Sequence, residues 1–211
     1  MNIASYLFTM SVAACVLTTA GSAFAQSTEG HGILVWGRIG PKQIVLEPAI
    51  QYNSRPRLPV EPGQHRVRGI DADGREVFSL SFRGISVADG DEEWQFNYFV
   101  PLGTEDLDRI YRIELITPWG DVARESAVSA GISLEKEGPA TDLEVLVETH
   151  AMIRIEWNAD AYPLAMIRDG TTSVLLSMAR NGTVRIPSKT RELEILLSDG
   201  VKTRTQRLTI R

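Results

Sequence analysis

The stretch HRVRGIDADGREVFSLSF, from His65 to Phe82, decides the fold class of this chain. Its first half leads into an Asp-Gly turn at residues 71–74 (DADG), and beyond the turn Phe78, Leu80 and Phe82 alternate with serines. A period of two places alternate side chains on one face of a strand, and an Asp-Gly turn beside such a run is the strongest short-range signal of a β-hairpin. The stretch therefore predicts two antiparallel strands.

Similar short apolar runs occur on both sides of this hairpin. They occupy residues 33–36, 44–46, 94–100, 111–115, 143–147, 153–157, 164–167, 174–178, 193–197 and 208–210. Turn residues separate them, the prolines of 55–63 exclude a central strand, and only Thr104 to Arg109 is compatible with a helical turn. We therefore expect an all-β protein of two small antiparallel β-sandwich modules, immunoglobulin-like or fibronectin-like.

The segment EKEGPA at residues 135–140 divides the chain, because it is charged and then carries Gly-Pro. It is predicted as a linker between a β-sandwich-like first domain and an immunoglobulin-like second domain. The full division is a signal peptide at 1–25, a polar lead-in at 26–31, the first domain at 32–134, the linker at 135–140, and the second domain at 141–211.

The first 25 residues predict export. They contain no Asp, Glu, Lys or Arg, and they end in a small-x-small pattern formed by Ala23 and Ala25, after which Gln26 would be the new N-terminus. A chain cleaved there is expected in the periplasm or the secreted fraction, with no stable membrane span. The single cysteine, Cys15, would leave with the leader, so the mature protein would form no disulfide.

Two alternatives to simple cleavage remain open. The leader is long enough to span a bilayer as an uncleaved anchor, which needs about 20 apolar residues. The run VAAC at 12–15 also resembles a bacterial lipobox, in which Cys15 would become the lipidated first residue of a membrane-anchored lipoprotein.

The charge of the chain argues against nucleic acid as a partner. The formal net charge is -5, and the leader contributes nothing to it. Proteins that bind nucleic acid neutralise phosphates with a basic surface, which neither half of this chain provides.

Several segments resemble a module of secreted bacterial proteins. The similar segments are WGR (36–38), LEPA (46–49), RP (55–56), LP (58–59), GIDADG (69–74), FSLSF (78–82), MIRD (166–169) and residues 193–201. The family is an uncharacterised β-sandwich module that often lies C-terminal to metallopeptidase-like domains. The resemblance implies a β-sandwich fold and export, and it supplies no catalytic residue to carry over.

Catalytic residues are not expected. The three histidines, His31, His65 and His150, lack the spacing that brings two imidazoles to one zinc ion, and His65 and His150 are predicted at strand ends. Ser86 and Ser133 lie in near matches to G-x-S-x-G that lack the second glycine. The alternative is a serine hydrolase that uses one of these serines with His65 or His150.

Carboxylates at two turns are weak candidates for calcium ligands, and no cofactor is expected. The calcium candidates are Asp71, Asp73, Asp89, Asp91 and Glu92. The first two copy the start of an EF-hand loop, but the position that an EF-hand fills with a closing Glu is Phe82. A hairpin turn and a solvated loop are therefore the preferred interpretations, with a joint calcium site on one rim as the alternative.

The four tryptophans complete the candidate residues. Trp94 and Trp157 fall in the inward register and are expected in the core, whereas Trp36 and Trp119 lie beside glycines at strand ends, where each ring can contact a ligand or cap the sandwich. The sequence thus favours an exported, non-catalytic binding or structural protein with a protein or glycan partner. The alternative is an accessory module that acts in trans with a secreted peptidase or glycan enzyme.

Overall fold

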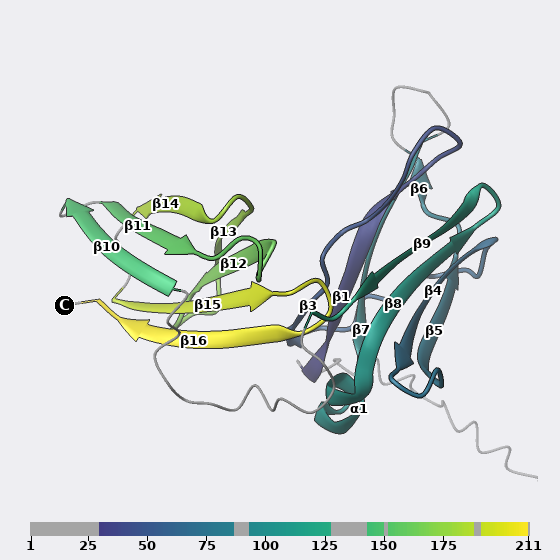
Figure 1. Cartoon of the computed structure of the whole chain (residues 1–211), viewed down its shortest axis with the longest axis horizontal. Coiled ribbons are helices and arrows are strands. Elements are labelled where there is room, and N and C mark those ends of the chain that lie inside the picture. The colour runs from purple at the N-terminus through teal and green to yellow at the C-terminus, as the bar shows by residue number, and fades with distance from the viewer. Residues whose placement is uncertain (1–29, 87–92, 128–142, 150–151, 188–190, 211) are drawn as a thin grey trace, which may run out of the picture.

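The structure is a computed structural model that describes residues 30–86, 93–127, 143–149, 152–187 and 191–210 (Figure 1). Several predictions fall outside these ranges: the signal peptide with Ala23, Ala25 and Gln26, Cys15, the calcium candidates Asp89, Asp91 and Glu92, the linker 135–140, Ser133 and His150. No helix among the described residues is long and apolar enough to cross a membrane.

The first β-sandwich consists of two antiparallel sheets. One sheet has the order β2-β1-β7-β6, with β3 also paired to β1, and the other has the order β5-β4-β8-β9. The elements are β1 (Gly30–Ile39), β2 (Ile44–Leu46), β3 (Ile50–Ser54), β4 (His65–Asp71), β5 (Glu76–Phe82), β6 (Ile85–Ser86), β7 (Trp94–Pro101), α1 (Thr104–Arg109), β8 (Ile110–Thr117) and β9 (Gly120–Glu125). Their inward side chains, such as Ile33, Val67, Phe96 and Leu115, form one buried core.

The hairpin predicted from His65 to Phe82 is confirmed as β4 paired with β5. Gly69 is needed in it, because a Cβ at this position would lie 2.3 Å from the ring of Phe78, its cross-strand partner. The predicted helical turn is likewise confirmed as α1. Strand β1 begins at Gly30, inside the predicted lead-in, because Gly30 and His31 pair with the backbone of β3.

The second β-sandwich is formed by a sheet of order β10-β11-β14 and a sheet of order β13-β12-β15-β16. Its strands are β10 (Leu143–Thr149), β11 (Met152–Trp157), β12 (Leu164–Asp169), β13 (Leu175–Ala179), β14 (Thr183–Pro187), β15 (Glu192–Ser198) and β16 (Thr203–Thr209). Its core contains Ile155, Trp157, Ile167 and Ile195, so the prediction that Trp157 is buried is confirmed. The all-β fold with sandwich modules is therefore as predicted.

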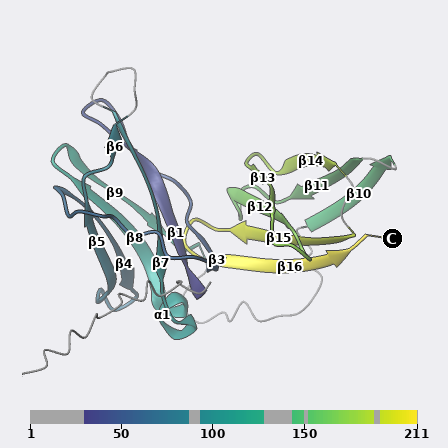
Figure 2. The ribbon, with the colours of Figure 1, turned by 180° about the vertical axis from the view of Figure 1, so that it is seen from behind.

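The two sandwiches pack end to side, and the turn between β15 and β16 reaches the first sandwich (Figures 1 and 2). Val201 in this turn is fully buried in the core of the first sandwich. Beside it, apolar side chains of both sandwiches form a shared cluster of Leu34, Ile50, Phe99, Leu164, Met166 and Leu196. Because this cluster is built from both units, the contact between the two sandwiches includes a small apolar core of its own.

Candidate functional site

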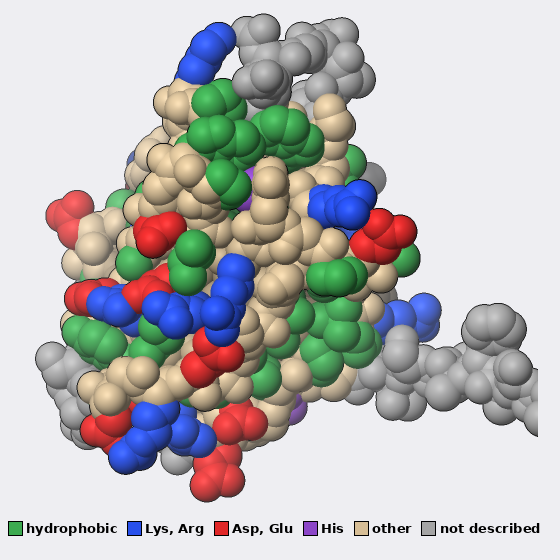
Figure 3. Space-filling model, turned by 90° about the vertical axis from the view of Figure 1, so that its right-hand side faces the viewer, with side chains coloured by type: hydrophobic (Ala, Val, Ile, Leu, Met, Phe, Trp, Pro, Cys, Tyr) green, Lys and Arg blue, Asp and Glu red, His purple; other side chains and the backbone are tan. Residues whose placement is uncertain are grey.

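The candidate site lies at the end of the first sandwich that carries β6 and the β8–β9 turn, at the top of Figure 1. Four segments far apart in the sequence meet there: the end of the proline-rich loop before β4, the residues after β5, the start of β7, and the β8–β9 turn. Hydrophobic side chains gather near the top of this face in Figure 3. Loops held by a rigid sandwich are a common location for binding sites.

Two tryptophan rings stack at this end. The rings of Trp94 and Trp119 lie 5.4 Å apart between centroids and within 14° of parallel. Trp94 is fixed by strand pairing, because it is opposite Ile39 of β1 and Ser86 of β6. Trp119 is fixed by its tight turn, where its backbone N–H donates to the hydroxyl of Thr117. Trp119 keeps 37% of its surface exposed, so part of an immobilised aromatic pair faces solvent.

His65 lies behind this pair. Its ring centroid is 5.6 Å from that of Trp119, 6.5 Å from Trp94 and 5.7 Å from Phe82, and only 2% of the residue is exposed. Among the residues that the structure describes, no group hydrogen-bonds its Nδ1 atom. Burial lowers the pKa of His65, so the imidazole is neutral at neutral pH.

A pocket of about 560 Å³ opens beside the buried histidine, lined by Gly63, Gln64, His65, Arg83 and Trp94. This volume is within the range of small-molecule sites. Gly63 lets the proline-rich loop close against β5, because a Cβ there would lie 2.3 Å from the carbonyl oxygen of Phe82. The loop thereby places Gln64 on the pocket wall.

Arg83 supplies the cation of this pocket. Among the described residues it pairs with Glu61 at 3.8 Å, and the two side chains are 74% and 69% exposed. An ion pair this long and this exposed contributes little, so the guanidinium remains available to a ligand. The pocket thus combines an aromatic wall, a neutral imidazole, an amide and a cation, which can orient a ligand but include no paired nucleophile and base.

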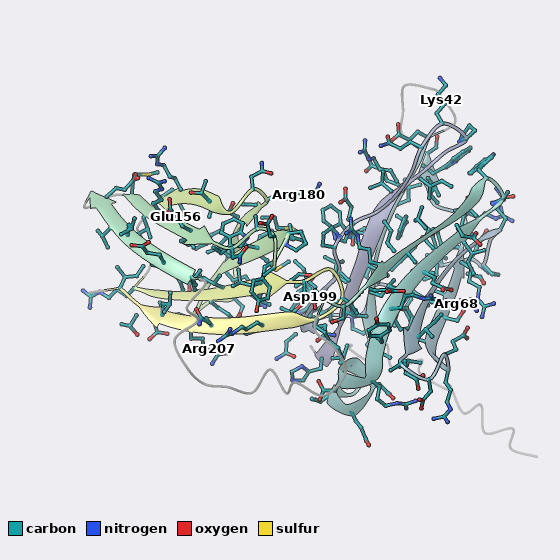
Figure 4. The ribbon with its side chains drawn as sticks, viewed as in Figure 1. Lys42, Arg68, Glu156, Arg180, Asp199 and Arg207 are labelled. Atoms are coloured by element: carbon teal, nitrogen blue, oxygen red, sulfur yellow. The ribbon has the colours of Figure 1, made fainter. Side chains whose placement is uncertain are left out.

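Trp119 is the sequence-predicted contact residue that lies at this site, and Trp36 lies elsewhere. The Nε1 of Trp36 donates to the carbonyl of Pro48 at 3.0 Å, and Arg180 of the second sandwich lies over its ring at 5.7 Å. Arg180 also pairs with Glu47 at 2.6 Å. Figure 4 shows Arg180 on the side of the second sandwich that faces the first. Trp36 therefore contributes to the contact between the sandwiches.

Trp94 was predicted to lie in the core. Its side chain does point inward, but it is not fully buried. Its side chain packs against the core of the first sandwich but is only half-buried, because it begins β7 at the open end of the sheet. The ring therefore forms a pocket wall and the support for Trp119. The pocket was not predicted from the sequence; the local signal for it is a glycine and a histidine, Gly63 and His65, directly after a proline-rich loop.

The first calcium candidate, Asp71, has its oxygens engaged by the protein. Oδ1 accepts from the backbone N–H groups of Asp73 and Arg75 at 3.0 and 2.8 Å, and Oδ2 accepts from Arg109 at 3.0 Å. The Arg75 backbone and the Arg109 guanidinium hold the pKa of Asp71 below its usual range. Asp73 pairs with Arg75 at 3.0 Å. The turn thus closes on itself, as the hairpin interpretation requires.

Asp71 and the start of β7 lie at opposite ends of the first sandwich, because β4 runs from His65 to Asp71 and His65 contacts Trp94. Glu93, the described neighbour of the other calcium candidates, instead pairs with Arg38 at 3.7 Å. No group of three metal-ligating side chains occurs in the described part of the chain.

Of the residues named for the serine hydrolase alternative, Ser86 and His65 lie in the described ranges. Ser86 lies in β6 opposite Trp94, and the Nδ1 atom of His65 accepts from or donates to no serine of the described ranges.

No family model and no curated protein matches the chain.

Proposed function

We propose that this chain is an exported, non-catalytic binding protein whose binding surface is the pocket end of the first sandwich. The observation that carries the proposal is the pocket lined by His65, Arg83 and Trp94, next to which the ring of Trp119 is stacked on Trp94 and keeps 37% of the residue exposed. A concave site with an aromatic wall and a few polar groups is the usual form of a ligand-binding site.

The surrounding structure supports binding without catalysis. The stacking of the two tryptophans and the close contact of the loop at Gly63 with β5 hold parts of the pocket in place. Less protein conformational entropy is therefore lost when a ligand binds. The buried contact with the second sandwich lies on the side of the first one, on the sheet face that carries Leu34, Ile50 and Phe99, and not at the end that carries the pocket.

Export is tested by the mass of the mature protein. Expression of the full chain in a bacterial host, followed by intact-mass analysis of the extracytoplasmic fraction, should give a chain that begins at Gln26. A chain lipidated at Cys15, or one that retains residues 1–25, would contradict simple release.

Binding is tested by the fluorescence of the tryptophan pair. Titration of the mature protein with a delipidated cell-envelope extract should change its tryptophan emission, and Trp119→Ala should abolish the saturable part of that change. Leu175→Ala is the matched control, because it removes an apolar side chain that is 52% exposed on β13 of the second sandwich. A response that persists in Trp119→Ala, or its absence in the parent protein, would contradict binding at this end.

A further inference from the structure

Strand β13 is an edge of the second sandwich that lacks the usual protection of sheet edges. The two sheets of this sandwich end in β10 and β14, and in β13 and β16. Three of these edge strands carry charged residues or a proline: Glu144 and Glu148 in β10, Arg185 and Pro187 in β14, and Arg204 and Arg207 in β16. The sequence of β13, LLSMA, has neither. Charges and prolines prevent an edge strand from pairing with another chain, so β13 is the edge that is open to such pairing.

Exposed apolar side chains gather on and beside this strand. Val174, Leu175, Leu176 and Met178 are 58%, 52%, 38% and 36% exposed. Consecutive leucines are exposed because the register with β12 shifts at Leu176, which has no partner in β12. The chain carries no charged residue between positions 170 and 179. A strand that pairs with this edge should therefore be apolar and uncharged as well.

The apolar surface of β13 continues the contact between the two sandwiches. Met178 is opposite Met166 of β12, and cross-strand partners project from the same face of a sheet. Met166 is only 3% exposed and belongs to the apolar cluster that both sandwiches share. Met178 is left partly exposed, so the apolar surface extends beyond the area that one copy of the chain covers.

The direction of β13 allows antiparallel pairing with a second copy of the chain. The strand ends beside Arg180, whose guanidinium lies over Trp36 of the first sandwich, and it begins at Leu175, away from that contact. Figure 1 shows β15 and β16 of the same sheet extending away from the first sandwich. A two-fold axis at Leu176 therefore places the two first sandwiches at opposite ends of the joined sheets. In that register Val174 is opposite Met178 of the second copy, so only uncharged side chains meet.

From the open edge, its composition and its direction we infer that this chain forms a two-fold symmetric dimer through antiparallel pairing of β13 with β13 of a second copy. Backbone hydrogen bonds across the edge and contacts between the leucines stabilise the pair. The paired strands have five residues each, and the irregularity at Leu176 shortens the straight part of the edge. Interfaces that bury less than about 1,200 Å² are weak, so the dissociation constant should lie between about 10 µM and about 1 mM.

Sedimentation velocity of the mature chain tests the inference over a range from about 5 µM to about 1 mM. The average mass should rise from that of a monomer towards that of a dimer. Leu176→Lys should weaken this association tenfold or more, because two ammonium groups would face each other at the axis. Val147→Lys is the matched control and should dimerise like the parent, because Val147 is 55% exposed on β10, an edge strand of the other sheet.

A mixture of two variants separates strand self-pairing from other kinds of association. Leu176→Lys and Leu176→Glu should each stay monomeric alone, and their equimolar mixture should dimerise, because opposite charges then meet at the axis. In the parent protein, hydrogen exchange of the backbone N–H groups of residues 174–179 should slow as the protein concentration rises, because the outward N–H groups become hydrogen-bonded.

A parent chain that is monomeric at about 1 mM would overturn the inference, even if β13 then bound an apolar peptide of another protein. A dimer that forms equally well in Leu176→Lys, or slowed exchange confined to residues outside 174–179, would also overturn it. If circular dichroism shows that Leu176→Lys is unfolded, Val174→Lys replaces it with the same expected result. Fluorescence titrations at about 1 µM protein lie below the dissociation range, so Leu175→Ala remains a control for the pocket.

Discussion

The hydroxyl of Ser198, at the end of β15, donates a hydrogen bond to the backbone carbonyl of Ala49 in the first sandwich, and both residues are buried. The backbone N–H of Ala49 in turn donates to the carbonyl of Gly200 at 3.0 Å. Nearby, the hydroxyl of Ser126 donates to Asp199 at 2.7 Å, and Figure 4 shows Asp199 at this junction. The β15–β16 turn is thus attached to the first sandwich by polar contacts as well as by the burial of Val201.

Ser198→Ala should lower the free energy of unfolding by about 1–3 kcal/mol, because the carbonyl of Ala49 would lose a buried donor. Urea denaturation followed by circular dichroism measures this change. Ser81→Ala is the control, since Ser81 is exposed on β5 and its loss should cost at most about 0.5 kcal/mol. Equal effects of the two substitutions would show that the junction contributes no stability.

Gly37→Ala should destabilise the first sandwich by about 1–3 kcal/mol, the usual cost of overpacking. A Cβ at position 37 would lie 2.0 Å from the carbonyl oxygen of Val45 and 2.9 Å from the ring of Phe96, and the carbonyl cannot retreat without disturbing the pairing of β1 with β2. The melting temperature measures the effect.

Gly30→Ala provides the comparison for this substitution. It lies in the same strand and has no atom within 4 Å of the added Cβ, so its melting temperature should stay near that of the parent. A stable Gly37→Ala protein would mean that β1 and β2 are packed less closely than described.

Local patterns predicted the hairpins and the short helix because each needs only neighbouring residues. Strands β3, β9 and β14 were not predicted because each is short and carries at most two apolar side chains on its inward face, too few to form a recognisable apolar run. Their strand conformation depends on tertiary pairing with β1, β8 and β11. Burial of His65 similarly depends on Phe82 and Trp119, which belong to other segments, so the residues next to His65 do not predict that its ring is buried.

We expect excess EDTA to leave the melting temperature unchanged within about 1 °C. A calcium ion bound to the folded protein would raise the melting temperature, and its removal would lower it. The carboxylate of Asp71 already accepts from two backbone N–H groups and from Arg109. Asp71→Asn should therefore lower the melting temperature with and without chelator, whereas Asp73→Asn, at a largely exposed side chain, should change it little. A chelator-dependent melting temperature would restore the calcium hypothesis.

His65 should make the stability of this protein depend on pH in a specific direction. Its pKa is lowered in the folded state by burial, while in the unfolded chain it returns to about 6.5. As the pH falls below about 6.5, the unfolded chain binds a proton at His65 that the folded chain does not, so the free energy of unfolding decreases. The decrease stops once the pH passes below the lowered pKa.

His65→Phe removes this linkage and retains an aromatic ring. The stability of the variant relative to the parent should therefore grow on going from about pH 7.5 to about pH 5, by at most about 1.4 kcal/mol for each pH unit between the two pKa values. Urea denaturation of both proteins across this range measures the difference, because the other titratable groups contribute equally to each. A difference that stays constant with pH would mean that the folded protein accepts a proton at His65 as readily as the unfolded chain, and hence that the imidazole is not held neutral behind the tryptophan pair.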